Sequence, residues 1–149
     1  MPRMVTVMVL PAGEGTPIKT VRIDGDDYLQ LNRLVQGNLG TCPLPPSWRA
    51  RRWYAFCDDD GAIRDPRPEQ NRWAIHLGHP FLYGPVVIVR NDDLGETRSL
   101  TRADVADLEM RFAMEPSVEA SQMAYYELNF WKAHPAGVSV YNFETNSWE

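Results

Sequence analysis

The fold is decided by residues 53–99, WYAFCDDDGAIRDPRPEQNRWAIHLGHPFLYGPVVIVRNDDLGETRS. The stretch begins with an aromatic strand over residues 53–57, which runs into an acidic turn. A short helix is expected over 69–77, followed by an apolar strand over 83–89 and a second turn at 91–93. Runs of β-branched and aromatic residues between Gly, Pro and Asp clusters are typical of strands. This order predicts a sheet with an intervening helix, and it carries no catalytic signature.

The residues before this stretch predict a hairpin and a helix. Residues 4–10 carry apolar side chains on both of the faces that alternate along a strand. This pattern indicates a central strand covered on both sides. Residues 18–23 alternate between apolar and polar, as a half-buried partner strand would. The acidic residues at 24–27 can accept hydrogen bonds from the first amides of a helix over 28–35. We expect Gly37 to end that helix in the left-handed conformation.

The remaining segments predict a connector, two helices and a last strand. Residues 41–47 hold three prolines, so we expect an extended connector. A helix should begin at Thr101 with a capping box. Residues 117–132 form a helix that is apolar around much of its circumference, so it is either sandwiched or in an intermolecular contact. Residues 137–143 alternate as a final strand.

The composition fits one ordinary globular domain. The chain has 149 residues, of which 44% are hydrophobic and 23% charged, with no apolar run of the roughly 20 residues that a membrane span needs. The net charge of −5 argues against a general nucleic-acid binder. Cys42 and Cys57 are the only cysteines and no secretion signal is apparent, so we expect a cytoplasmic protein.

These observations predict an α+β fold in a single domain spanning residues 1–149. The sheet should be mixed or mainly antiparallel, with three or four helices mostly on one face. Residues 1–115 would form the core, and residues 116–149 an aromatic-rich C-terminal helix–strand extension.

Residues 5–109 resemble a family known as a domain of unknown function, number 3846. The resemblance is carried by the opening hairpin and five short motifs, namely Leu29-Gln30, Leu34-Val35-Gln36-Gly37, the acidic turn ending in Gly61, the pair Asn71 and Ala74, and Tyr83-Gly84-Pro85-Val86-Val87. The chain departs from the family at Gly37-Asn38, where paired glycines are more usual. The resemblance implies a small α+β fold from actinobacteria or their phages, and it supplies no catalytic residue.

An arginine cluster is the first candidate site. Arg49, Arg51 and Arg52 are flanked by Trp48 and Trp53. Guanidinium groups hold phosphates by bidentate bonds, and aromatic rings stack on bases, so these five residues could bind a nucleotide. The alternative is a solvated strand edge, whose charges prevent sheet-to-sheet aggregation.

The aromatic residues of the C-terminal part are the second candidate site. Seven of the sixteen aromatic residues lie in residues 125–149. We single out Tyr125, Tyr126, Phe130 and Trp131 as a surface for a partner protein or a second copy of the chain, since interfaces favour aromatic side chains. The alternative is that they cover a face of their own sheet.

Metal-binding and catalytic patterns are weaker. The adjacent acidic residues 58–60 suit a hairpin turn with Gly61 at positive φ better than a cation loop. His76, His79 and His134 have no metal-ligand spacing with the two cysteines. Cys57 and His76 could pair as nucleophile and base, but no third residue is identifiable. We therefore expect no metal, no cofactor and no catalytic residue.

The sequence thus favours a non-enzymatic phage-type or mobile-element-type protein that sequesters or modulates a host macromolecule in the cytoplasm. Its partner would be a host protein or a second copy of the chain, and neither a membrane nor nucleic acid is expected. The alternative is a protein that binds a nucleotide or a phosphorylated signal through Arg49, Arg51 and Arg52. An enzyme is a third possibility, because active sites assemble from residues far apart in sequence.

Overall fold

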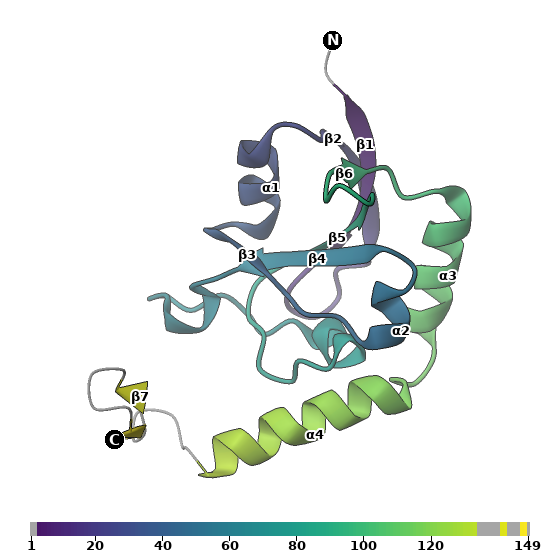
Figure 1. The fold of residues 1–149 in the computed structure, drawn as a ribbon. Coiled ribbons are helices and arrows are strands. Elements are labelled where there is room, and N and C mark those ends of the chain that lie inside the picture. The colour runs from purple at the N-terminus through teal and green to yellow at the C-terminus, as the bar shows by residue number, and fades with distance from the viewer. Residues whose placement is uncertain (1–2, 134–140, 143–146, 149) are drawn as a thin grey trace.

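The chain forms one antiparallel sheet with helices on both faces, as Figure 1 shows. This computed structural model describes residues 3–133, 141–142 and 147–148. The strands of the sheet are β1 (Met4–Leu10), β2 (Lys19–Asp24), β3 (Leu39–Thr41), β4 (Trp53–Asp58), β5 (Val86–Asn91) and β6 (Thr97–Arg98). The helices are α1 (Tyr28–Val35), α2 (Pro46–Arg49), η1 (Gly61–Ile63), η2 (Arg72–Leu77), α3 (Arg102–Ala113) and α4 (Val118–Ala133), where η denotes a 3₁₀ helix. A separate strand pair consists of β7 (Tyr141–Asn142) and β8 (Ser147–Trp148).

The strand order is β2-β1-β5-β4-β3, and β6 forms a hairpin with β5. All these pairs are antiparallel, which confirms the predicted α+β class. β1 lies between its hairpin partner β2 and β5, with Val7 opposite Val21 and Val9 opposite Val87. The prediction of a central strand over 4–10 and a half-buried partner over 18–23 is therefore confirmed.

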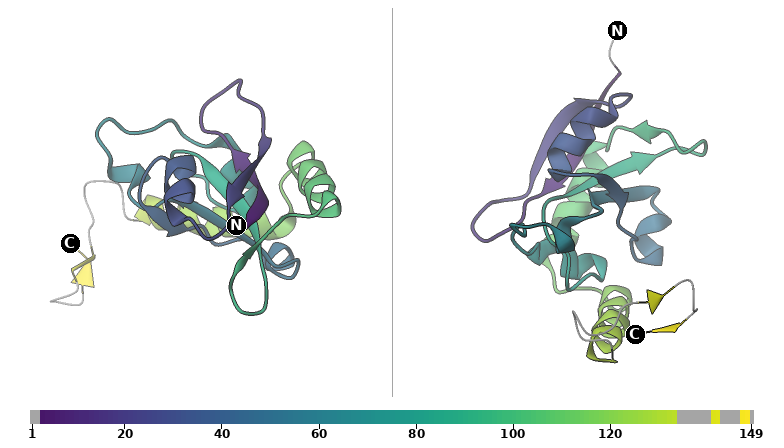
Figure 2. Two further views of the ribbon diagram at one scale, coloured as in Figure 1. Left: turned by 90° about the horizontal axis from the view of Figure 1, so that it is seen from above. Right: turned by 90° about the vertical axis from the view of Figure 1, so that its left-hand side faces the viewer.

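The sheet separates two hydrophobic clusters, because successive side chains of a strand point to opposite faces. Figure 2 shows α1 on one side of the sheet and α3 on the other. The cluster beneath α1 consists of Val5, Val7, Val9, Ile23, Leu31, Val35, Val87 and Val89. The cluster on the opposite face consists of Met8, Leu10, Cys42, Leu44, Trp48, Trp53, Ala55, Leu77, Val86, Ile88, Leu100, Leu108 and Phe112.

Three of the helices lie where local signals predict them. Asp27 caps α1 by accepting a hydrogen bond from the N–H of Leu29 at 3.0 Å. At α3, the Thr101 hydroxyl accepts from the N–H of Asp104 at 3.0 Å, and the Asp104 carboxylate accepts from the N–H of Thr101 at 2.9 Å. This reciprocal pair is the predicted capping box. The predicted helix over 117–132 is α4.

The predicted role of Gly37 is wrong. Gln36 takes the left-handed conformation that ends α1, with φ 60° and ψ 39°. Gly37 is needed for a different reason, because a Cβ there would lie 2.2 Å from Cγ of Asp58. The Asp58 side chain is 1% exposed, and its carboxylate accepts hydrogen bonds from the N–H groups of Asn38 and Asp60 at 3.1 Å each. The glycine thus makes room for a buried carboxylate.

The acidic segment after β4 is also not the predicted hairpin turn. It leads into η1, and Gly61 does not take a positive φ. A Cβ on Gly61 would lie 2.6 Å from the backbone oxygen of Tyr83, so close approach of two backbones explains this glycine. Asp58 forms an ion pair with Arg64, which follows η1. This segment therefore links β4 to the loop after η1.

Three further boundaries differ from the sequence expectation. α2 begins at Pro46, inside the expected connector. A helix can begin there because proline in the first turn of a helix loses no hydrogen bond. β3 precedes that connector and was not predicted. The short helix predicted over 69–77 is η2, capped by Asn71. Of the strand predicted over 137–143, residues 137–140 and 143 lie outside the described residues.

Candidate functional site

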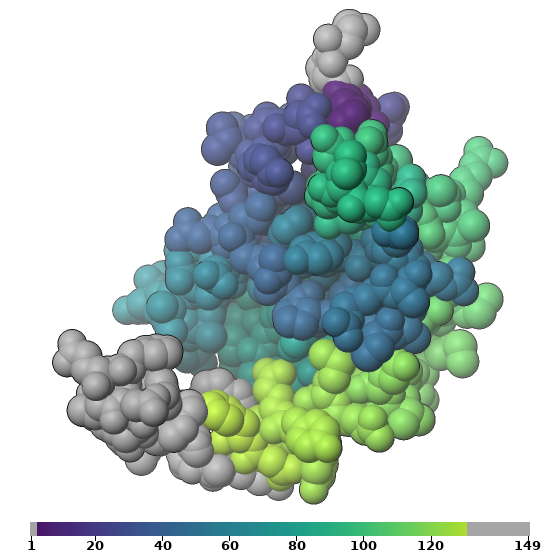
Figure 3. All heavy atoms as spheres, viewed as in Figure 1, coloured from purple at the N-terminus to yellow at the C-terminus, as the bar shows by residue number. Residues whose placement is uncertain are grey.

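α4 runs along the lower edge of the molecule in the view of Figure 3. Ala120 and Ala124 are buried, and their small side chains allow the helix to come close to its neighbours. A Cβ on Gly78, at the end of η2, would lie 2.5 Å from Cβ of Met123. The N–H of Ser47 donates to the Glu119 carboxylate at 3.0 Å. α4 is thus held against both η2 and α2.

The outward face of α4 carries exposed aromatic side chains. Tyr125 is 64% exposed and Tyr126 is 73% exposed, and their rings meet edge to face with centroids 6.0 Å apart. Phe130 is also on the exposed side, one turn further along. Trp131 belongs to α4 but lies outside the residues whose side chains the structure describes. Two of the four predicted partner-binding residues therefore form one exposed aromatic pair, with a third beside them.

A hollow adjoins this aromatic pair. It has a volume of about 460 Å³ and is lined by Pro116, Val118, Ser121, Gln122, Tyr125 and Tyr126. Its walls come from the N-terminal half of α4 and from the proline that precedes the helix. We call the exposed side chains of Val118, Tyr125 and Tyr126 the α4 aromatic face. A continuous apolar patch beside a hollow is a common feature of protein-binding surfaces.

The two tryptophans of the predicted arginine site are buried and are not available for stacking on a ligand. Trp48 is 2% exposed and Trp53 is 1% exposed, and the two rings pack edge to face within the core, 5.7 Å apart. Neither indole has a face on the surface for a base to stack on. Arg51 forms an ion pair with Asp107 at 3.3 Å, and Arg52 forms one with Asp93. The arginines are exposed, but carboxylates partly neutralise them.

A different arginine lies over the two indoles. The guanidinium carbon of Arg111, on α3, is 5.4 Å from the ring centroid of Trp48 and 5.0 Å from that of Trp53. Arg111 is tied to Asp107, one helical turn before it, at 2.8 Å. Cation–π contacts of this kind stabilise the fold. No local pattern predicts this pairing, because it joins residues about sixty positions apart.

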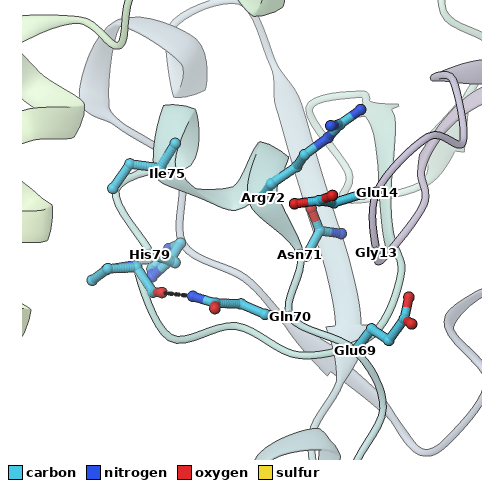
Figure 4. Close-up of a pocket in the computed structure, with 9 residues that line it drawn as sticks. Gly13, Glu14, Glu69, Gln70, Asn71, Arg72, Ile75 and His79 are labelled. Carbon is cyan, nitrogen blue, oxygen red and sulfur yellow. Dashed lines mark hydrogen bonds between the residues drawn. The ribbon is translucent and has the colours of Figure 1, made fainter.

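A cavity lies between the β1–β2 loop and η2 (Figure 4). It has a volume of about 710 Å³ and is lined by Gly13, Glu14, Glu69, Gln70, Asn71, Arg72, Ile75, His79 and Pro80. Figure 4 shows Gly13 and Glu14 on one side, with Gln70 and His79 on the other. The N–H of Gly13 donates to the Gln70 carbonyl at 3.1 Å and fixes the loop.

The side-chain amides of this cavity donate hydrogen bonds to backbone carbonyls. The Asn71 amide donates to the carbonyls of Leu10 at 2.9 Å and Gly84 at 3.0 Å, and the Gln70 amide donates to the Pro80 carbonyl. The titratable groups on its walls are the carboxylates of Glu14 and Glu69, the guanidinium of Arg72 and the imidazole of His79.

The histidine near Cys57 is His79, and not His76 as the sequence hypothesis proposes. His76 Nε2 lies 2.9 Å from the Met114 carbonyl and its ring packs on Phe112. His79 faces Glu127 of α4 on one side and the Pro43 carbonyl on the other, and it is in electrostatic contact with Cys57. Glu127 of α4 is the carboxylate that contacts His79.

The described part of the chain has neither a metal-binding cluster nor a membrane-spanning helix. No three His, Cys, Asp or Glu side chains within residues 3–130 converge to hold a metal ion. His134, one of the three histidines of the sequence, lies outside the described residues. None of the described helices has the length and apolar character needed to span a bilayer.

Comparison with known proteins identifies the family but no relative of known activity. No curated protein and no solved structure matches the chain. A family model described as Domain of unknown function (DUF3846) matches residues 5–113. The match runs from β1 to the end of α3, and α4 lies beyond it. Because it covers well over half of the chain, the protein belongs to the DUF3846 family.

Proposed function

We propose that this protein is a binding protein that docks a macromolecular partner through the α4 aromatic face. The observation that supports this most is that, within residues 118–130 of α4, only Ala120 and Ala124 are buried, while Tyr125 and Tyr126 are largely exposed to water. Tyrosine brings much contact area at little entropic cost, and its hydroxyl keeps the free surface soluble. We further propose that the partner is a host protein and that binding sequesters or modulates it.

The cellular setting belongs to the same proposal. Two neighbouring cysteines that are both free thiols suit a reducing cytoplasm. The resemblance that pointed to actinobacteria and their phages is the ground for proposing a phage or mobile element as the source.

Affinity capture with matched tyrosine variants tests the proposal. The double variant Tyr125→Ser, Tyr126→Ser should lose its partner, because removing two central interface aromatics typically costs about 2 kcal/mol or more, roughly a 30-fold loss of affinity. The control is Tyr28→Ser on α1, since Tyr28 is 65% exposed and its loss removes the same chemistry from another surface. Bound proteins are quantified by mass spectrometry from lysate of cells that carry the gene.

The expected result is one partner captured equally by wild type and Tyr28→Ser and lost from the double variant. Equal capture by all three proteins, or no specific partner for any of them, would contradict the proposal. Light scattering on the same samples identifies a second copy as the partner, because the mass would be twice 17.0 kDa. Near-identical melting temperatures verify that the variants are folded.

The alternative, a phosphorylated small ligand held by Arg49, Arg51 and Arg52, lacks the stacking rings expected from the sequence. A ligand would also compete with Asp107 and Asp93 for the guanidinium groups. We therefore expect flat melting temperatures across a panel of nucleotides. A ligand present at a hundred times its Kd would stabilise the protein by about 2.7 kcal/mol. A rise in Tm that disappears in Arg51→Ala would establish this alternative.

A further inference from the structure

The two cysteines of the chain lie side by side on one face of the sheet. β3 and β4 are antiparallel with Gly40 opposite Cys57, and the N–H of Cys42 donates to the Ala55 carbonyl at 2.9 Å. Residues two apart on a strand share a face, so Cys42 and Cys57 occupy diagonal positions on the same face. Both cysteines are free thiols, and each shifts the pKa of the other. The register thus places the two side chains on one face of neighbouring strands, where a small movement can bring the sulfurs together.

The two thiols differ in their surroundings. Cys42 is buried in the core, whereas Cys57 is half-buried, with its sulfur 4.0 Å from the Thr41 carbonyl oxygen. The interaction with Cys42 lowers the pKa of Cys57, although burial acts to raise it. The charge of His79 lowers this pKa further. The same interaction and burial raise the pKa of Cys42. Cys57 is thus the thiol of the pair that ionises more readily.

His79 lies between two hydrogen-bond acceptors and interacts electrostatically with Cys57. Its Nδ1 lies 3.3 Å from the Glu127 carboxylate, and its Nε2 faces the Pro43 carbonyl oxygen. Both neighbours are acceptors, so only the doubly protonated ring can donate to both. Burial opposes the charge, but the two hydrogen bonds outweigh it and raise the pKa of His79. When His79 is protonated, its charge favours the thiolate form of Cys57, and a neighbouring cation of this kind is typical of reactive cysteines.

We propose that Cys57 and Cys42 form a two-cysteine oxidation site that reacts with hydroperoxides, with Cys57 as the attacking residue and Cys42 as the resolving residue. His79, oriented by Glu127 of α4, is the positioning residue for Cys57. This site is independent of the α4 aromatic face, because Glu127 lies on the inward side of the helix.

The reaction proceeds in two balanced steps. The Cys57 thiolate sulfur attacks one peroxide oxygen, the O–O bond breaks, and the departing hydroxide takes up a proton to leave as water, with Cys57 as a sulfenic acid. The Cys42 sulfur then attacks the Cys57 sulfur and forms the S–S bond, and the expelled hydroxide takes the Cys42 proton and leaves as a second water. Two thiols lose two electrons in total, and one hydrogen peroxide gains them.

Mass spectrometry of the full-length protein treated with hydrogen peroxide tests the site. Wild type should form an intramolecular disulfide at monomer mass. Cys42→Ser should stop at a sulfenic acid on Cys57 that dimedone traps, whereas Cys57→Ser should give no disulfide and react more slowly. Retention of both thiols in wild type, or over-oxidation of Cys57 without a disulfide, would overturn the proposal.

The role of His79 is tested by the pH profile of iodoacetamide labelling at Cys57. His79→Gln should move the midpoint of the profile to higher pH, because the stabilising cation is lost. The control is His76→Gln, which removes the other histidine of this region and should leave the midpoint in place. Identical midpoints for wild type and His79→Gln in folded protein would exclude the positioning role.

Discussion

Trp53→Ala is expected to destabilise the protein by about 4 kcal/mol, the largest loss that we predict for a single substitution. Trp53 begins β4, and its ring fills the space between the sheet and α3. Truncation removes the contacts with the Trp48 ring and the Arg111 guanidinium. It also removes the hydrogen bond from the indole N–H to the Asp104 carboxylate at 3.2 Å. Urea unfolding followed by circular dichroism measures the change.

The control for this prediction is Tyr54→Ala. Tyr54 is the next residue of β4, but it points to the other face and is exposed. Its loss should cost about 1 kcal/mol or less, as substitutions of exposed residues generally do. Equal destabilisation by the two variants would contradict the placement of Trp53 in the core. A small effect of Trp53→Ala would revive the prediction that this ring is free to stack on a ligand.

Asp58→Asn is the second change with a large expected effect, about 3 kcal/mol at pH 7. The Asp58 carboxylate accepts from the backbone N–H groups of Asn38 and Asp60 and forms an ion pair with Arg64. The asparagine amide offers one acceptor oxygen where the carboxylate offers two. Its NH₂ group would face the N–H donors that the carboxylate accepts from. Hydrogen bonds to charged groups contribute about 1.5–3 kcal/mol each, and buried donors left unpaired add a further cost.

The pH dependence of this effect has a definite sign. The hydrogen bond from Arg64 is the main cause that lowers the pKa of Asp58 below its ordinary value of 3.8. A carboxylate with a lowered pKa stabilises the folded state fully above the unfolded pKa, and that contribution is lost as the pH falls through the folded pKa. The difference in the free energy of unfolding between wild type and Asp58→Asn should therefore be largest at pH 7 and shrink below about pH 4.

Urea unfolding at pH 7 and at about pH 3 provides the measurement. Asp59→Asn is the matched control, since Asp59 is the exposed neighbour and contributes its backbone N–H, not its carboxylate, to the contact with Asn38. Its stability should stay close to that of wild type at both pH values. A difference for Asp58→Asn that is constant or grows at low pH would contradict the assignment of a buried ionised carboxylate.

Local signals predicted the elements whose ends are encoded by neighbouring residues. The capping box at Thr101 and the acceptor at Asp27 act over three residues or fewer, so they can be read directly from the sequence. The central strand over 4–10 could be predicted because apolar side chains occupy both of its faces, as in a strand of a sheet that is covered on both sides. α2 was missed because three prolines suggest an extended chain, although one of them suits the first turn of a helix.

The candidate site could be predicted only in part, because its contacts join distant residues. The aromatic residues of α4 could be singled out from the sequence, but whether they cover their own sheet or face the solvent depends on how the helix packs, and the structure shows Tyr125 and Tyr126 exposed. The burial of Trp48 and Trp53 depends on α3, which follows them by about fifty residues. In the same way, Cys57, His79 and Glu127 come from β4, the loop after η2 and α4, and no spacing rule connects them.

The central claim is that the α4 aromatic face is where a partner binds, and photo-crosslinking in living cells tests it most directly. A photoreactive phenylalanine analogue is placed at Tyr126 in one protein and at Tyr28 in another, and the crosslinked products are identified by mass spectrometry. We expect a discrete crosslinked product from position 126, with another protein or a second copy, and none from position 28. The same products from both positions, or none from position 126, would contradict the claim.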